Sequence, residues 1–168
     1  SLGNFITLDE FFTGSHPLLE QPYSPMTIRF FILQAHYRGT VDFSNEALQS
    51  AEKALARMND GYRRLQELKA SDTSTLEGVS DLEKRAYEAL DDDFNTPVLI
   101  GVLFDAVRMV NQVNDHTATA TQADIDALKA IFDTFLIEIL GITPDGASAG
   151  SAADLKPYHD AVDLLLQI

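Results

Sequence analysis

The chain has 168 residues, and 45% of them are hydrophobic, so it can bury the core of one domain and is not disordered throughout. It contains no cysteine, which excludes disulfide bonds, thiolate metal sites and a cysteine nucleophile. Its 26 acidic and 12 basic residues give a formal net charge of −14, and this balance disfavours DNA and RNA partners because a negative surface repels a polyanion.

The first predicted elements are two helices separated by a loop. Thr7 has the side chain of an N-cap, and Gly14 ends the short helix that follows it. Residues 14–25 contain three prolines and one glycine, a composition that predicts a loop. The Ser-Pro pair at 24–25 then begins helix 26–37, which has almost no polar face and is expected in the core.

The longest predicted helix covers residues 45–69, with Ser44 as its N-cap. Its apolar residues recur in steps of three and four and define one buried seam along about seven turns, formed by Leu48, Ala51, Leu55, Met58, Tyr62 and Leu65. The following residues, 70–78, are rich in Ser, Thr and Asp and predict a loop.

Two more helices are predicted in the middle of the chain. A capping box of Ser80 with Glu83 predicts a helix to about residue 90. Thr96 followed by Pro97 predicts a helix to about residue 114, with a seam of Leu99, Leu103, Ala106, Val110 and Val113. The longest charge-free apolar stretch, residues 94–104, is shorter than the roughly 20 residues of a membrane span. We therefore expect no transmembrane helix, no signal peptide and no membrane partner.

The last well-defined helix has Thr121 as N-cap and Gly141 as its end, with a buried face of Ile125, Leu128, Phe132, Phe135 and Ile139. Residues 142–154 are mostly small or polar and predict a linker. Residues 155–168 predict the start of another helical element. Because no alternating strand pattern of comparable length occurs, the predicted fold class is all-α, a helical bundle.

No residue pattern predicts a metal site or a catalytic centre. The run Asp91–Asp93 could attract Mg²⁺ or Ca²⁺, but consecutive side chains diverge and the spacing of a calcium loop is absent. We interpret the run as a turn before the next helix, whose N-terminus favours negative charge. The histidines are scattered, and there is neither a phosphate-binding glycine loop nor a nucleophile elbow.

Five segments resemble one enzyme family. Ser1-Leu2-Gly3-Asn4 resembles the end of the Lys-Met-Ser-Lys-Ser-Leu-Gly-Asn loop of class I aminoacyl-tRNA synthetases. The segments that follow it in order are Phe5–Leu8, Ile28–Arg38, Val41–Ser44 and Ala89–Pro97. This ordered set is similar to cysteinyl-tRNA synthetases over about residues 1–141, and it implies that the chain begins inside the loop, with Ser1 as a remnant.

The resemblance implies a non-catalytic part of a larger enzyme. Family members join cysteine to its tRNA using ATP, and a zinc ion in their catalytic domain selects the cysteine. In the family, the ATP-contacting motif and the zinc ligands precede this loop. The chain alone is therefore expected to hold no cofactor and to be catalytically inactive. Its implied partners are cysteine tRNA and its own catalytic domain, in the cytoplasm. Residues 1–40 resemble the stem-contact segment and residues 41–141 the helical, DALR-type tRNA-binding domain; the loop at 14–23 is longer than the family's.

The resemblance also gives the basic residues a role, since seven of the twelve lie between positions 29 and 69. Contacts of this kind go mainly to phosphates and riboses. The candidates for RNA contact are Arg29, His36, Tyr37, Arg38, Arg57, Arg63 and Arg64. Arg57 and Arg64 are seven residues apart and share a helix face, whereas Arg29 lies in an apolar helix and could instead hold a buried carboxylate. We interpret Phe30, Phe31 and Tyr62 as core residues.

Two other functions remain open from the residues alone. The basic residues could be solvated helix faces of an acidic helical module that binds a protein and has no RNA role. A di-metal four-helix bundle is disfavoured, because the helices contain no Glu-x-x-His pair.

Overall fold

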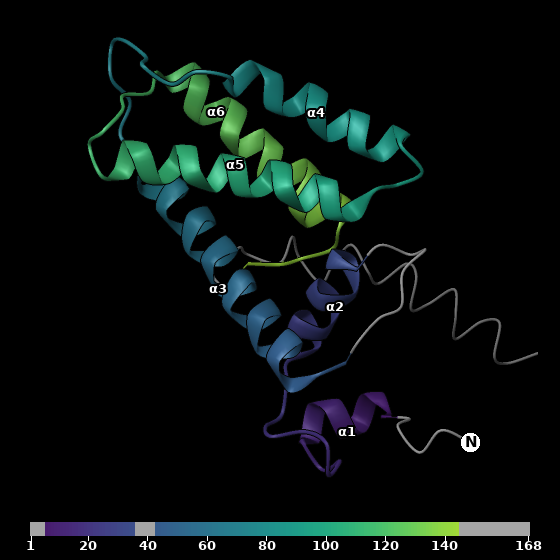
Figure 1. Cartoon of the computed structure of the whole chain (residues 1–168). Coiled ribbons are helices and arrows are strands. Elements are labelled where there is room, and N and C mark those ends of the chain that lie inside the picture. The colour runs from purple at the N-terminus through teal and green to yellow at the C-terminus, as the bar shows by residue number, and fades with distance from the viewer. Residues whose placement is uncertain (1–5, 36–42, 145–168) are drawn as a thin grey trace, which may run out of the picture.

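The computed structural model describes residues 6–35 and 43–144, and within these ranges helices joined by loops are the only regular secondary structure, as predicted. The helices are α1 (Leu8–Thr13), α2 (Pro25–Gln34), α3 (Asn45–Glu67), α4 (Val79–Asp91), α5 (Thr96–Asn114), α6 (Gln122–Ile131) and the π-helix η1 (Phe132–Ile139). Figure 1 shows α4, α5 and α6 together at one end of the molecule, α3 and α2 leading away from them, and α1 at the opposite end.

The predicted helix starts are confirmed at four places. Each of these N-cap side chains accepts a hydrogen bond from the backbone N–H of the third helical residue; the four caps are Thr7, Ser24, Ser44 and Thr121. Gly14 and Gly141 end their helices in the left-handed region, with φ of 68° and 64°. Local sequence chemistry therefore determines these boundaries.

Three predicted boundaries are wrong. Helix α4 begins at Val79 after Gly78, whose φ is 81°, so Ser80 lies inside the first turn and caps nothing. The N-cap of α5 is Asn95 rather than Thr96. The Thr96 hydroxyl instead donates to the carbonyl of Leu33 at 2.7 Å, which ties the start of α5 to α2. Helix α2 also ends at Gln34, before the predicted residue 37.

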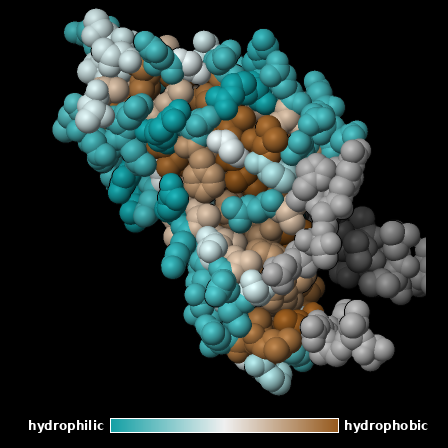
Figure 2. Space-filling view, in the orientation of Figure 1, coloured by the Kyte–Doolittle hydropathy of each residue, from teal (hydrophilic) through white to brown (hydrophobic). Residues whose placement is uncertain are grey.

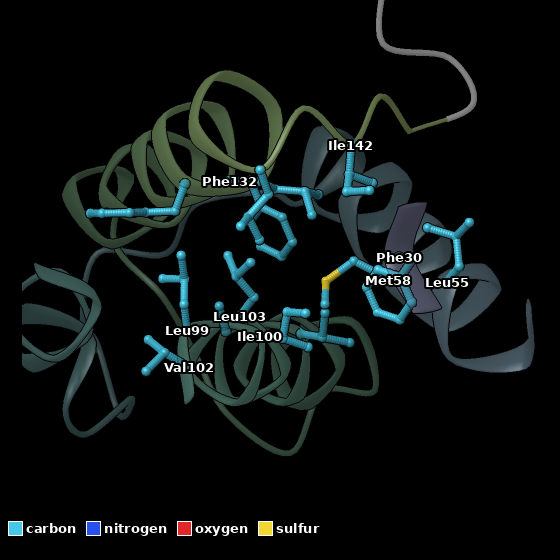
Figure 3. Close-up of a cluster of buried hydrophobic side chains, with 14 of the residues drawn as sticks. Phe30, Leu55, Met58, Leu99, Ile100, Val102, Leu103, Phe132 and Ile142 are labelled. Atoms are coloured by element: carbon cyan, nitrogen blue, oxygen red, sulfur yellow. The ribbon is translucent and has the colours of Figure 1, made fainter. Parts of the chain in front are cut away.

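Helix α5 is the centre of the fold. It contacts α2, α3, α4, α6 and η1, and its predicted seam is fully or almost fully buried. Figure 3 shows how side chains of four elements meet in this interior, among them Phe30 of α2, Met58 of α3, Leu103 of α5 and Phe132 of η1. The predicted seam of α3 is buried too, except that Tyr62 is partly exposed. The core lies where these seams converge.

Helix α5 is also long and apolar enough to cross a membrane, with a mean hydropathy of 1.2. The charge-free stretch of the sequence did not indicate this, because the helix includes Asp105 and Arg108. Half of its apolar window is buried inside the bundle, and Leu99 and Val110 have no exposed surface. The position of α5 as the core helix explains its apolar character.

Helices α3 and α5 approach each other closely at Gly61. A β-carbon on Gly61 would lie 2.7 Å and 2.9 Å from the two γ-carbons of Val107. No further carbon atom fits between the Gly61 backbone and the Val107 side chain, so these two residues set how closely the helices approach. Arg57 and Arg64 of α3 lie four residues before and three residues after this crossing.

Candidate nucleic-acid interface

Two predicted arginines of α3 lie against α5. The guanidinium carbon of Arg57 is 5.5 Å from the centroid of the Phe104 ring, which is a cation–π contact. Arg64 Nη1 donates to Asn111 Oδ1 at 2.7 Å. The two arginines are seven residues apart on α3, and their partners are seven apart on α5. Arg57 and Arg64 therefore share a face, as their spacing predicts, and that face runs along α5.

Both guanidinium groups remain available to a ligand. Arg57 is exposed and Arg64 is half-buried. A guanidinium has five N–H donors, and the amide of Asn111 takes one of those of Arg64. The contacts with α5 thus hold each guanidinium group in place, while most of its N–H donors make no contact with α5. In Figure 2, hydrophilic residues line the left side of the molecule along α3, and hydrophobic residues occupy much of the area to their right.

Arg63 and Arg29 are placed differently. Arg63 Nη2 lies 2.8 Å from Asp60 Oδ1, with 64% of its side chain exposed, and it is roughly 100° around the helix from Arg64. Arg29 is exposed on α2, and its Nη1 donates to the carbonyl of Gly141 at 3.2 Å. Its partner in the described part of the chain is a backbone carbonyl rather than a buried carboxylate. The structure therefore brings Arg57 and Arg64 together and leaves these two apart.

Several predicted features lie outside the described residues. These are Ser1, His36, Tyr37 and Arg38, together with most of the predicted linker and the whole of residues 155–168. Their roles stay predictions.

The aromatic residues near the arginines belong to the core, as interpreted from the sequence. Phe30 and Phe31 are buried, and the ring of Tyr62 packs edge-on against Phe132 with 6.0 Å between centroids. Burial raises the pKa of the Tyr62 phenol, and the nearby Asp133 carboxylate adds to this effect. These rings are committed to packing and do not form a platform for stacked bases.

Two further arginines come close to this surface and were missed by the sequence analysis. Arg85 of α4 and Arg108 of α5 both pair with Asp105 of α5. The prediction followed the basic cluster between residues 29 and 69 and so stopped short of them. The spacing of Arg108 from Asp105, three residues on one helix, was the available signal. The pairing with Arg85 spans 20 residues and requires the tertiary fold.

The residues that the structure describes form no zinc site. The chain has no cysteine, and no group of three or more His, Asp or Glu residues in the described ranges is placed to hold a metal ion. Asp91 ends α4, and Asp92 accepts a hydrogen bond from Asn95 Nδ2 at 2.9 Å in the turn to α5. The acidic run is therefore the turn that the sequence predicted.

Comparison with known proteins identifies the family. Residues 85–143 match the DALR domain. Over its whole length the chain is 53% identical to the cysteine–tRNA ligase of Porphyromonas gingivalis. The chain is a homologue of cysteine–tRNA ligases. The cysteine–tRNA ligases of Bacteroides fragilis and Chlorobaculum tepidum are 51% and 33% identical over 99% and 100% of the chain. The resemblance noted in the sequence is confirmed.

The homology covers only part of the cysteine–tRNA ligases. The chain spans 34%, 33% and 33% of these three relatives, about a third of their length. Within the chain, the DALR match includes Arg85, Arg108 and the two α5 residues that hold the arginines of α3. Arg57 and Arg64 precede the matched range but lie directly against it.

Proposed function

We propose that this chain is the tRNA-positioning part of a cysteine–tRNA ligase and does not catalyse the ligation itself. The observation that carries the proposal is the 53% identity to a cysteine–tRNA ligase over the whole chain. The arginines that α5 holds at the surface of α3 support it, because fixed guanidinium groups suit phosphate oxygens. The cytoplasm is the proposed location.

The proposed role is to hold the RNA, not to read its bases. Arg57 and Arg64 would contact backbone phosphates and fix the orientation of the RNA relative to the rest of the ligase. Arg29, His36, Tyr37, Arg38 and Arg63 remain proposed contacts. With a formal net charge of −14, the chain repels RNA at long range, so its isolated affinity is expected to be weak and strongly dependent on salt.

We assign the ligation of cysteine to tRNA to the full-length enzyme and not to this chain by itself. The ligase as a whole would use ATP and zinc. The described residues of this chain contain no group that could hold zinc, and the sequence contains no phosphate-binding glycine loop. We keep the proposed division into a stem-contact segment, residues 1–40, and a tRNA-binding bundle, residues 41–141. The catalytic domain is the proposed second partner, besides cysteine tRNA.

A titration of the chain with cysteine tRNA and with an unrelated tRNA at low salt tests this proposal. The variant Arg57→Glu/Arg64→Glu is compared with Lys84→Glu/Lys129→Glu, which changes the net charge equally. We expect the wild type to bind, the first variant to lose most binding and the control to retain more of it. Arg63→Glu is tested separately, because Arg63 lies on another side of α3.

Circular dichroism and the milder variant Arg57→Gln/Arg64→Gln show whether any loss of binding comes from unfolding. No binding of either tRNA by the wild type would contradict the proposal and favour the acidic protein-interaction module. Equal loss in both charge-matched variants would also contradict it, since only the total charge would then matter.

A further inference from the structure

Three charged side chains, Arg85 of α4 and Asp105 and Arg108 of α5, form a cluster at the surface. Arg85 Nη2 of α4 lies 2.6 Å from Asp105 Oδ2 of α5, and Arg108 Nη2 lies 3.3 Å from Asp105 Oδ1. The side chain of Asp105 is 28% exposed and that of Arg108 is 68% exposed. Two guanidinium groups share one carboxylate, so the cluster keeps excess positive charge and presents it to solvent.

This cluster adjoins the arginines of α3. Arg108 lies four residues after Phe104 and three before Asn111, so the three side chains share one face of α5. Phe104 and Asn111 are the residues that hold Arg57 and Arg64. Helix α5 contacts both α3 and α4 (Figure 1). Arginines of α3, α5 and α4 therefore follow one another across one surface.

Structural support of the helices does not account for the whole cluster. Arg85 ties α4 to α5, because it reaches across to Asp105. Arg108 adds nothing to this tie, since it is on the same helix as Asp105, and an exposed pair of this kind contributes little to stability. A groove between α4 and α5 is also lined by Glu88 and Asp92. Arg85 and Asp105 line the same groove, so the groove beside Arg85 holds more acidic than basic side chains.

We propose that Arg108 and Arg85 extend the surface of Arg57 and Arg64 and bind phosphates of the same RNA backbone. Asp105 orients both guanidinium groups. Because it is a fixed negative charge, it also limits their affinity for phosphate. Each guanidinium has five donors in a planar fork, so it can hold the carboxylate and a phosphate oxygen together. This inference rests on the proposed RNA-binding function and names further positioning residues for it.

Titrations of the whole chain with cysteine tRNA at several salt concentrations test the inference. The variants are Arg108→Gln, Arg85→Gln and Asp105→Asn. Lys84→Gln is the matched control, because Lys84 neighbours Arg85 in sequence but pairs with Glu88 on its own helix. We expect Arg108→Gln and Arg85→Gln each to weaken binding roughly threefold to tenfold and to reduce the slope of log affinity against log salt by about one.

The other two variants are expected to behave differently. Asp105→Asn should strengthen binding, because it removes a negative charge beside the phosphates, and Lys84→Gln should leave the salt slope unchanged. Wild-type binding by both Arg108→Gln and Arg85→Gln would overturn the inference. If Arg57→Gln/Arg64→Gln still weakened binding in that case, the proposed function would stand without it. Absence of any RNA binding by the wild type would overturn both.

Discussion

At the scale of single residues, the arginines of α3 show how a charge is fixed in place at a protein surface. A free arginine side chain loses rotamer entropy when it binds a ligand. Contact with Phe104 and with Asn111 restricts Arg57 and Arg64 before any RNA arrives. Part of the rotamer entropy of these arginines is therefore lost on folding and not on binding. The partner described for Arg63 is Asp60 on the same helix, and Arg63 is more exposed than Arg64.

The pairing of Thr121 with Asp124 at the start of α6 gives a prediction for a single residue. The Thr121 hydroxyl donates to Asp124 Oδ2 at 2.7 Å, and the Thr121 backbone N–H donates to the same oxygen at 2.9 Å. The hydroxyl contact is the main cause that lowers the pKa of the Asp124 carboxyl, followed by the backbone contact. Thr121→Ala should raise that pKa toward its ordinary value, as measured by NMR titration.

The same variant should lower the free energy of unfolding by about 1 kcal/mol near neutral pH, because the N-cap is lost. The stabilisation from Asp124 is fully present above its unfolded-state pKa and is lost as the pH falls through its lower folded-state pKa. Thr73→Ala, in an exposed loop, is the control and should leave both quantities unchanged. An unaltered pKa of Asp124 in Thr121→Ala would contradict this account.

At the scale of elements, periodicity predicted most of the fold. The seams of α3 and α5 repeat over many turns, so each buried position is supported by several others of the same helix. The start of α4 was harder, because Ser80 and Glu83 match a capping box. The structure begins the helix one residue before Ser80, where Val79 is 93% buried, and Gly78 in the left-handed region allows this. Burial outweighed the local cap.

The change from α6 to η1 was also not predicted. The sequence favours one continuous helix to Gly141, but residues 132–139 form a wider π-helix with Phe132, Phe135 and Leu136 buried. The Phe135 ring packs edge-on against Tyr87 of α4, with 5.0 Å between centroids. The wider i→i+5 turn shifts the buried face: Leu136 and Leu140 are buried, whereas Ile139, predicted to be buried, is only partly so. In the candidate site, helical spacing predicted that Arg57 and Arg64 share a face of α3. It could not predict their partners on α5, because those contacts depend on how the helices pack.

The crossing of α3 and α5 gives a prediction for an element. Gly61→Ala would place a methyl group less than 3 Å from Val107, a cost of about 1 to 3 kcal/mol that exceeds the gain of roughly 1 kcal/mol in helix propensity. Urea denaturation should therefore show a less stable protein. Gly101→Ala is the matched control, because no atom lies within 4 Å of its added β-carbon, and it should be stabilised by about 0.5 to 1 kcal/mol.

A second change distinguishes the clash from other effects. Val107→Ala should remove most of the penalty of Gly61→Ala, so the double variant should be more stable than the sum of the two single effects predicts. Additive effects would contradict the claim that Gly61 and the Val107 side chain set the distance between α3 and α5.

At the scale of the whole molecule, the acidic composition and the proposed RNA contacts are compatible because charge is unevenly placed. The formal net charge is −14, yet Arg57, Arg64, Arg108 and Arg85 follow one surface of three helices. The surplus of carboxylates elsewhere disfavours RNA on other faces. The central claim is therefore about one face of the molecule, and a measurement that locates bound RNA tests it better than affinity alone.

NMR spectra of the isotopically labelled chain, with and without cysteine tRNA at low salt, locate the contact most directly. We expect the arginine side-chain signals of Arg57, Arg64 and Arg108, and the backbone signals of residues 53–64 and 104–111, to shift or broaden first. Signals of α1 and of α6 should change least. Changes confined to α1 or α6, or a spectrum unaffected by tRNA, would contradict the assignment of RNA binding to the α3–α5 surface.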